Sequence, residues 1–480
     1  MADNSFMKSG LFYMMGNLLS RGISFLLLPL YSRYISAEEY GIYALLLAFY
    51  TVVSALLQGG LQNGFAKYYF ETSDRHKREL IFSSYFNGSL IISLAVCSLL
   101  FIFSGTVSKL LLGSSNASGL VRIVLLMNFI DALMFISLYL LKTMELSGRV
   151  FYLSGISAVL NLLLNVWLIM FRKTGIEGIL WAQIITNTII LAILLFGIRR
   201  YIRPVIVTGI LKKIIIFSAP LAIAGIFTDL TDVADRFILN IYLDAKTVGI
   251  YSFSYKIAMV MNVLVISFRT AWTPYSLRTY RERQDYGIIF ASQFKKLIAM
   301  SALLFLAVSI FIDDLFILNI SGERLFDAQY LPGITIIPVV LAGYIFNGLA
   351  SFFSVYPFVS NKSYHFLAAD TIAAASNIAI NFLLIPVWGI MGAAFATCVS
   401  YLFCMVYLAL ISRSIEIRYD YIRLVIFLII IIAFFVISKY TNNIFLDVIL
   451  LITALPAAAW FSGIRLHSLS LIKPDRMDLR

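Results

Sequence analysis

The sequence contains few charged residues, cysteines and histidines. Asp, Glu, Lys and Arg make up 13% of the 480 residues, and the chain has three Cys and three His. Soluble domains average about 25% charged residues, so this composition excludes an ordinary soluble protein. Because Cys97, Cys398 and Cys404 all lie in apolar stretches, we expect small packing residues rather than a disulfide framework.

Motifs for covalent chemistry are also missing. The sequence contains no Gly-rich phosphate loop, nucleotide motif or metal-ligand cluster, so we expect no cofactor and no ATP hydrolysis by this chain. No polar stretch is long enough for a soluble domain. His76, His365 and His467 fall in predicted cytoplasmic segments, and no nucleophile, base and acid occur together. The sequence therefore favours a non-enzymatic protein over a membrane enzyme such as a polymerase, ligase or acyltransferase.

Long apolar runs fill the chain instead. Hydrophobic residues make up 61% of the sequence, and the mean hydropathy is +0.92. Runs of about 20 residues are long enough to cross about 30 Å of hydrocarbon as helices, and they lack the alternation of a membrane β-barrel. The sequence predicts an all-α polytopic membrane protein with about fourteen transmembrane helices. The predicted spans are 11–33, 40–62, 80–104, 119–141, 150–171, 176–198, 213–241, 249–273, 293–312, 331–355, 364–387, 389–411, 421–439 and 444–463.

The net charge of +12 is explained by orientation in the membrane rather than by nucleic-acid binding. With both ends on one side, about 25 Lys and Arg fall on that side and about 7 on the other, as the positive-inside rule requires. We therefore expect both termini in the cytoplasm and no nucleic-acid partner. The N-terminal segment lacks a small-residue cleavage site, which favours an uncleaved first span.

Two parts of the sequence resemble each other. The stretch "NLLLNVWLIMFRKTGIEGILWA" (161–182) matches "NIAINFLLIPVWGIMGAAFA" (377–396), and "SAEEYGIYALL" (36–46) matches "DAKTVGIYSFS" (244–254). Similar offsets predict two copies of six spans, in lobes 1–205 and 206–415, followed by two further helices and a cytoplasmic tail in 416–480. Transporters built from such repeats bind substrate near the midplane, between the halves.

Charged residues lie inside several predicted spans, most densely in "IFTDLTDVADRFILNIYL" (226–243). An ionised group at mid-span costs roughly 2.5–3.5 kcal/mol, so these side chains should face water or pair with each other. Asp229, Asp232 and Arg236 form one helical stripe. The candidate cavity residues are Arg21, Asp229, Asp232, Asp235, Arg236, Lys256 and Arg269, with Asp131 and Asp370 as candidates for coupling or cavity support.

Structural roles are open for some of these charges. Asp235 and Arg236 are also consistent with a local ion pair. Arg269 and Asp370 are expected near the inner ends of their spans and Arg122 near an outer end, where a long side chain reaches the interface at little cost.

Three stretches resemble a known transporter family. The first span and connector "NLLSRGISFLLLPLYSRYISAEEYGIYALL" is similar to the corresponding part of bacterial polysaccharide transporters. The stretch "DRFILNIYLDAKTVGIYSFSYKIAMVMN", followed by "WTP", and the hairpin "NFLLIPVWGIMGAAFATCVSYL" resemble later parts of the same proteins. These are the Wzx-type oligosaccharide or O-antigen flippases, in a superfamily with lipid II flippases and multidrug antiporters.

This resemblance implies a place in the bacterial inner membrane and two six-helix lobes that form a V around a central cavity, which opens alternately to each side. The implied cargo is an undecaprenyl-pyrophosphate-linked oligosaccharide, with membrane lipid and other polysaccharide-assembly membrane proteins as further partners. The resemblance also implies that Arg21 contacts phosphate. Asp229 and Asp232 depart from a purely cationic cavity, and they would hold arginines in place or couple H⁺ or Na⁺. Lipid II flipping and cation-coupled drug export stay open as alternatives.

Overall fold

The computed structural model describes residues 22–463 except 24, 59, 321, 361, 363, 418 and 442. Helices dominate this part of the chain, with a single two-stranded hairpin, β1 (Asn319–Ile320) and β2 (Glu323–Arg324). Ten helices are long and apolar enough to span a membrane among the described residues, or eleven if the bent pair α11 (Ala245–Ala258) and α12 (Val260–Glu282) forms one span. The prediction of an all-α polytopic membrane protein is confirmed, and the number fourteen stays a prediction.

The chain divides into two compact units. The first contains residues up to Ile257 together with 326–333 and 370–396, and the second contains 258–325, 334–369 and the remainder. These units do not follow the order of the chain, because α16 (Tyr364–Ile411) contributes to both. The predicted lobe boundaries at 205 and 415 stay a prediction.

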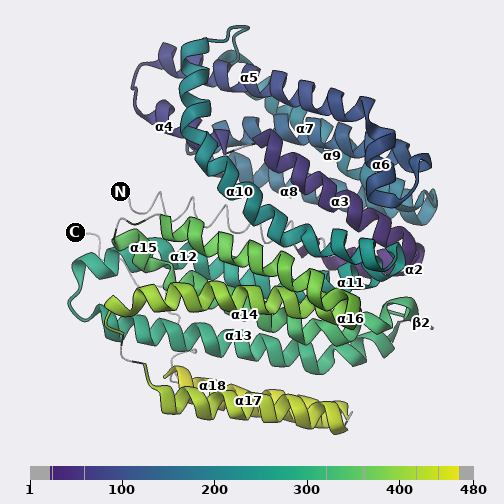
Figure 1. The fold of residues 1–480 in the computed structure, drawn as a ribbon, viewed down its shortest axis with the longest axis vertical. Coiled ribbons are helices and arrows are strands. Elements are labelled where there is room, and N and C mark those ends of the chain that lie inside the picture. The colour runs from purple at the N-terminus through teal and green to yellow at the C-terminus, as the bar shows by residue number, and fades with distance from the viewer. Residues whose placement is uncertain are drawn as a thin grey trace. The chain divides into compact units, whose positions relative to one another are not determined.

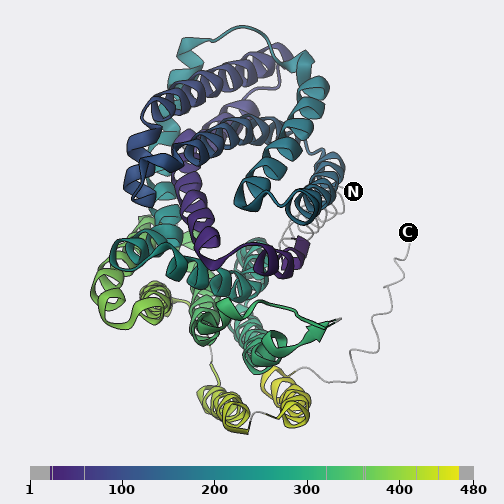
Figure 2. The same cartoon turned by 90° about the vertical axis from the view of Figure 1, so that its right-hand side faces the viewer.

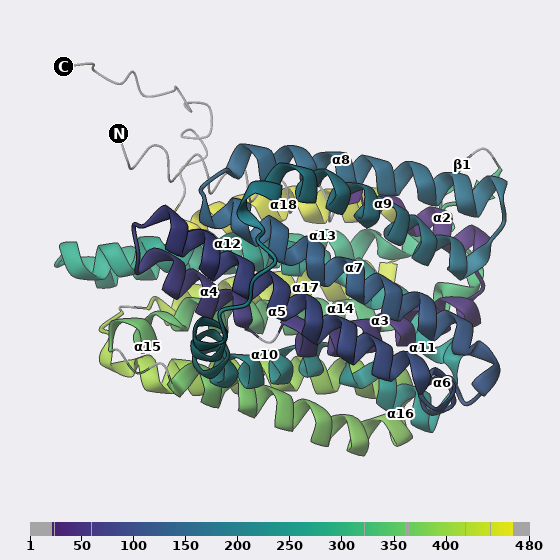
Figure 3. The same cartoon turned by 90° about the horizontal axis from the view of Figure 1, so that it is seen from above.

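The helices of the first unit pack around α7 (Ser118–Thr143), which contacts helices on several sides (Figures 1 and 3). Apolar residues recur around most of this helix, so it can be buried by several neighbours at once. The other helices of this unit are α2 (Leu28–Tyr34), α3 (Ala37–Gln58), α4 (Leu61–Phe70), α5 (Arg75–Ile102), α6 (Ser104–Leu112), α8 (Ser147–Val166), α9 (Gly175–Ile198), α10 (Thr208–Tyr242) and α11.

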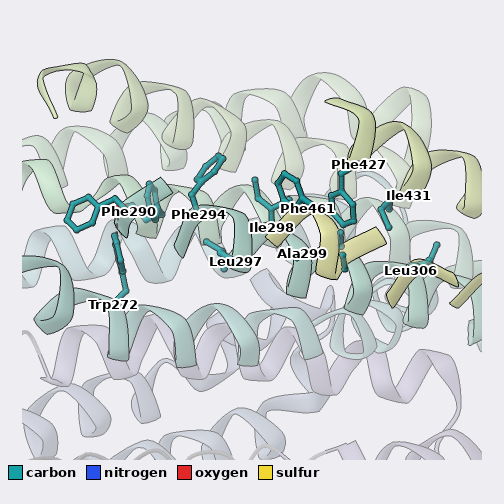
Figure 4. Packing of buried hydrophobic residues seen from close by; sticks show 14 of the residues in the cluster. Trp272, Phe290, Phe294, Leu297, Ile298, Ala299, Leu306, Phe427, Ile431 and Phe461 are labelled. Atoms are coloured by element: carbon teal, nitrogen blue, oxygen red, sulfur yellow. Dashed lines mark hydrogen bonds between the residues drawn. The ribbon is translucent and has the colours of Figure 1, made fainter. Parts of the chain in front are cut away.

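The second unit is built on α13 (Tyr286–Ile317), which packs against α12, α14 (Ile337–Phe353), α17 (Tyr421–Thr441) and α18 (Ile444–Ser462). Figure 2 shows these helices nearly end-on, with α17 in yellow-green and α18 in yellow. Figure 4 shows part of the core, including Trp272, Phe427 and Phe461. Trp272 stacks on Phe352 with ring centroids 4.8 Å apart, and Phe427 stacks on Phe461 with centroids 4.6 Å apart. Because lipid tails are themselves apolar, close packing rather than exclusion from water stabilises such a core.

Local signals in the sequence explain several helix ends. Ser36 and Glu39 form a capping box at the start of α3, where the Ser36 N–H donates to Glu39 Oε2 (3.1 Å) and the Glu39 N–H donates to Ser36 Oγ (3.2 Å). At the equivalent place in the second repeat, Asp244 Oδ1 accepts from the Thr247 N–H (2.7 Å) at the start of α11. The helices α3 and α11, which occupy equivalent places in the two copies, thus both begin at a side-chain cap.

The repeat seen in the sequence is also visible in backbone geometry. Gly175 has φ 58° and Gly389 has φ 55°, in the left-handed region that favours glycine, and Gly389 divides α16. Gly41 of α3 and Gly249 of α11 approach each other so closely that a Cβ on either would overlap the other helix's backbone. Equivalent glycines of the two copies thus make a reciprocal contact within the first unit.

Candidate functional site

A polar pocket lies among the helices of the first unit. Its volume is about 160 Å³, room for roughly five waters. The polar side chains that line it come from α2, α3, α7, α8, α9 and α11, so distant parts of the sequence build one site. They are Tyr31, Tyr43, Tyr50, Asp131, Asn161, Asn165, Gln183 and Lys256.

Asp131 is held on one side of this pocket by two donors. The Tyr50 hydroxyl donates to Asp131 Oδ2 (2.7 Å), and Asn187 Nδ2 donates to Asp131 Oδ1. The side chain belongs to α7 and is buried, with 8% of the residue exposed. Both carboxylate oxygens thus have a partner, as a buried carboxylate requires.

A chain of amide side chains forms another side of the pocket. The Tyr31 hydroxyl donates to Asn165 Oδ1 (2.9 Å), and Asn165 Nδ2 donates to Asn161 O (2.8 Å) and Asn161 Oδ1 (3.1 Å). Asn161 Nδ2 in turn donates to Gln183 Oε1 (3.0 Å). These bonds link α2, α8 and α9, so hydrogen bonding fixes the positions of the polar groups that line the pocket.

Lys256 supplies the cation of the pocket's lining. The side chain comes from α11 and is half-buried, and its Nζ lies 5.6 Å from the centre of the Tyr31 ring, within cation–π range. Within the described part of the chain, no carboxylate forms an ion pair with Lys256. The ammonium therefore keeps donors for an anionic or hydroxyl-bearing ligand.

The charges of the stretch 226–243 form a different cluster. Asp235 is buried, and it accepts from Arg236 Nη1 (2.9 Å) and from the Tyr251 hydroxyl (2.5 Å). The Arg236 guanidinium lies 4.9 Å from the centre of the Tyr255 ring. An ion pair within α10, joined to α11 through the Tyr251 hydroxyl, thus accounts for these two charges. Neither residue lines the polar pocket as the structure describes it.

The remaining predicted site residues are dispersed. Asp229 is half-buried and Asp232 is exposed, both on α10. Asp370 is half-buried on α16, and Arg269 is exposed on α12 in the second unit. Arg21 lies outside the described residues. The pocket therefore brings together Asp131 and Lys256 of the predicted set, and the functional roles of all these residues stay predictions.

Sequence reasoning did not select the uncharged members of the pocket as site residues. Asn161 and Asn165 marked the repeat, but their amides were not identified as part of a site. A signal was available, because Asn161 and Asn165, like Gln183 and Asn187, are four residues apart and so share a helix face within an apolar span. Paired amides at that spacing indicate a hydrogen-bonded interior.

The apolar spans and the helical architecture define a multi-pass membrane protein. Residues 6–280, more than half of the chain, match the family described as "Polysaccharide biosynthesis protein". The chain belongs to this family of polysaccharide transporters and flippases, which confirms the resemblance found in the sequence. No curated protein sequence matches the chain.

Solved transporter structures have a similar fold. The lipid II flippase MurJ, in an inward closed conformation, has a TM-score of 0.73 at 18% identity, covering 96% of this chain and 100% of that chain. An inward-facing multidrug resistance MATE family transporter gives 0.65 at 14% identity over 84% of this chain and 94% of the other. A MOP superfamily transporter from Pyrococcus furiosus gives 0.61 at 14% identity, over 85% and 95%. At these identities the likeness shows the fold alone.

Proposed function

We propose that this protein flips an undecaprenyl-pyrophosphate-linked oligosaccharide from the cytoplasmic to the periplasmic leaflet, for synthesis of a surface polysaccharide. The observation that carries the proposal is the family match of residues 6–280, on a fold similar to that of a lipid II flippase. The transport cycle would open the substrate cavity to each side of the membrane in turn, and both termini would lie in the cytoplasm.

The chemistry of the pocket supports such a cargo. A lipid-linked sugar carries hydroxyl groups and an anionic pyrophosphate. The amides of Asn161, Asn165 and Gln183 suit hydroxyl groups, and the Lys256 ammonium suits a phosphate oxygen. A volume of about 160 Å³ cannot enclose a whole oligosaccharide, so the pocket would contact one part of the head group. Arg21 is proposed to contact phosphate as well.

Asp131 supports a second role for the same pocket. A carboxylate surrounded by hydroxyl and amide groups can accept a proton or a small cation, so Asp131 would couple an H⁺ or Na⁺ gradient to the cycle, with Asp370 as a further candidate. Lys256 lines the same pocket, and its charge would disfavour a bound cation while phosphate is absent. Substrate charge and coupling ion would thus influence each other electrostatically.

Complementation tests this proposal. In a strain that lacks the gene, surface polysaccharide is scored after reintroduction of wild type, Lys256→Met, Asp131→Asn or Lys246→Met at matched membrane abundance. Lys246 is the matched control, because it is an exposed lysine on the same helix, α11. We expect Lys256→Met and Asp131→Asn to reduce polysaccharide at least about tenfold, the equivalent of 1.4 kcal/mol, and Lys246→Met to resemble wild type.

Other outcomes would favour a different function. If deletion leaves polysaccharide intact and instead sensitises cells to cationic drugs, the cation-coupled antiporter replaces the flippase. If deletion blocks cell-wall synthesis, lipid II is the cargo. Full rescue by both Lys256→Met and Asp131→Asn would show that the polar pocket serves folding alone.

A further inference from the structure

A second concave surface lies on the first unit, between α5 and α7 and outside the polar pocket. Its volume is about 530 Å³. Nearly all of its lining is apolar, and the large side chains Leu94, Phe101 and Leu126 are each more than two-fifths exposed on helices long and apolar enough to span the membrane. We call this surface the α5–α7 groove; it is lined by Leu94, Cys97, Ser98, Phe101, Ile102, Arg122, Ile123, Leu125, Leu126 and Phe129.

One cation lies in the lining of this apolar groove. The Nε of Arg122 donates to Ser104 Oγ (2.9 Å), and its guanidinium lies 5.0 Å from the centre of the Phe101 ring. These contacts orient the guanidinium but leave both terminal NH₂ groups available. Arg122 makes no ion pair with any residue that the structure describes, and no carboxylate lines the groove.

The groove has a charged end and an apolar length, an arrangement that matches the head group and acyl chain of a lipid. Arg122 lies four residues after the start of α7 at Ser118, close to the end of the helix and hence to the membrane surface. The apolar lining continues to Phe129, seven residues or about 10 Å further along the helix. A cation near the interface above an apolar channel complements a phosphate joined to an acyl chain, and Arg binds phosphate with two parallel hydrogen bonds.

We propose that the α5–α7 groove binds a membrane glycerophospholipid, whose phosphate pairs with Arg122 and one of whose acyl chains lies along α5 and α7. With no carboxylate in the lining to repel it, a lipid with a net negative head group binds better than a zwitterionic one. The topology predicted from the charge distribution places this end of α5 and α7 on the outer side, so the lipid comes from the outer leaflet. This site is independent of the flipped cargo.

Native mass spectrometry of the full chain tests the proposal. Protein in detergent micelles is titrated with phosphatidylglycerol, and the fraction with one bound lipid is compared among wild type, Arg122→Gln and Arg172→Gln. Arg172 is the matched control, because it is an exposed arginine directly after the π-helical turn Trp167–Phe171 that continues α8. Its guanidinium lies 5.9 Å from the centre of the Trp167 ring, and it lines no part of the groove. We expect Arg122→Gln to weaken the first binding step about fivefold and Arg172→Gln to leave it unchanged.

A second variant separates the acyl chain from the phosphate. Leu126→Trp fills the groove and leaves Arg122 in place, so it should also weaken binding about threefold or more. Diacylglycerol, which lacks the phosphate, should bind wild type and Arg122→Gln equally. Equal phosphatidylglycerol binding by wild type and Arg122→Gln would overturn the proposal and leave Arg122 as an interfacial residue. Equal losses in Arg122→Gln and Arg172→Gln would also overturn it, because they would indicate non-specific charge attraction.

Discussion

The polar pocket of the first unit and the aromatic core of the second unit are built from different kinds of side chain. Asp131, Asn165, Asn187 and Asp235 are each more than nine-tenths buried, and each is hydrogen-bonded to another side chain. The core of the second unit instead consists of rings and aliphatic groups from α12, α13, α14, α17 and α18, beginning with Trp272. Apolar helices thus surround a hydrogen-bonded polar pocket in the first unit and a cluster of aromatic and aliphatic side chains in the second.

This difference has an energetic meaning. Measured side-chain hydrogen bonds between membrane helices contribute only about 0.6 kcal/mol on average, so a polar interior is a weak way to hold helices together. Close aromatic packing stabilises a core without burying polar groups that need partners. A carboxylate, an ammonium and several amides around one pocket therefore fit the proposed ligand binding better than a role in stability.

The largest expected effect is on the second unit. Trp272→Ala should lower the free energy of unfolding by about 3 kcal/mol, because it removes the stack on Phe352 and the bond from Trp272 Nε1 to Phe352 O (3.0 Å). Thermal unfolding in detergent measures the change. Trp460→Ala is the matched control, because Trp460 is 47% exposed on the surface of the same unit and should matter little. Equal losses of unfolding free energy in Trp272→Ala and Trp460→Ala would contradict the comparison, because packing in the core would then stabilise the unit no more than packing at its surface.

A medium effect is expected at the repeated asparagine pair. Asn381 Nδ2 donates to Asn377 Oδ1 (2.8 Å), as Asn165 Nδ2 does to Asn161 Oδ1, but neither Asn377 nor Asn381 lines the polar pocket. Asn165→Leu and Asn381→Leu should each change stability by only about 1 kcal/mol, since side-chain hydrogen bonds within the membrane contribute little to stability. Polysaccharide output should fall severalfold with Asn165→Leu alone.

This pair sharpens the distinction between function and packing inside the first unit. Polysaccharide output is measured by complementation at matched membrane abundance, and the stability of each purified variant is measured by thermal unfolding in detergent. Loss of output with both variants, or with Asn381→Leu alone, would argue that the repeat's hydrogen bond, and not the pocket, is what transport requires.

The smallest effect is expected at a helix cap outside the membrane spans. The Thr247 N–H, which donates to Asp244, lowers the pKa of the Asp244 carboxyl below its usual range. A carboxyl whose pKa is lowered by folding stabilises the folded state above the pKa of the unfolded chain, and this contribution disappears as the pH falls through the folded pKa. Asp244→Ala should therefore cost about 0.5 kcal/mol at pH 7, and the cost should shrink near pH 3.

Asparagine provides the control for this cap, because it caps helices as well as aspartate does but does not titrate. Asp244→Asn should keep most of the stability at pH 7 and lose the pH dependence. A wild-type minus Asp244→Ala difference that stays constant from pH 7 to about pH 3 would contradict the role of the ionised carboxylate.

Much of the fold could be predicted from the residues. The apolar runs predicted the membrane helices, and the echo between 36–46 and 244–254 pointed to the positions that the structure brings together at Gly41 and Gly249. The site was harder to predict. Asp131 and Lys256 were selected because charge inside a span is costly, whereas Tyr31, Tyr50 and the amides were not, because uncharged polar residues in a membrane helix are common and individually carry little signal.

The sequence by itself determined the class of protein and the family, and it predicted the direction of the helices, because hydropathy, repeated motifs and charge asymmetry depend only on the order of residues along the chain. Only the tertiary structure decided which charges meet. Asp235 and Arg236, adjacent in sequence, became a local pair with Tyr251, while Asp131 and Lys256, far apart in sequence, came to line one pocket. Helical periodicity fixes the face on which a side chain lies, but the helix opposite that face is set by the packing of the whole unit.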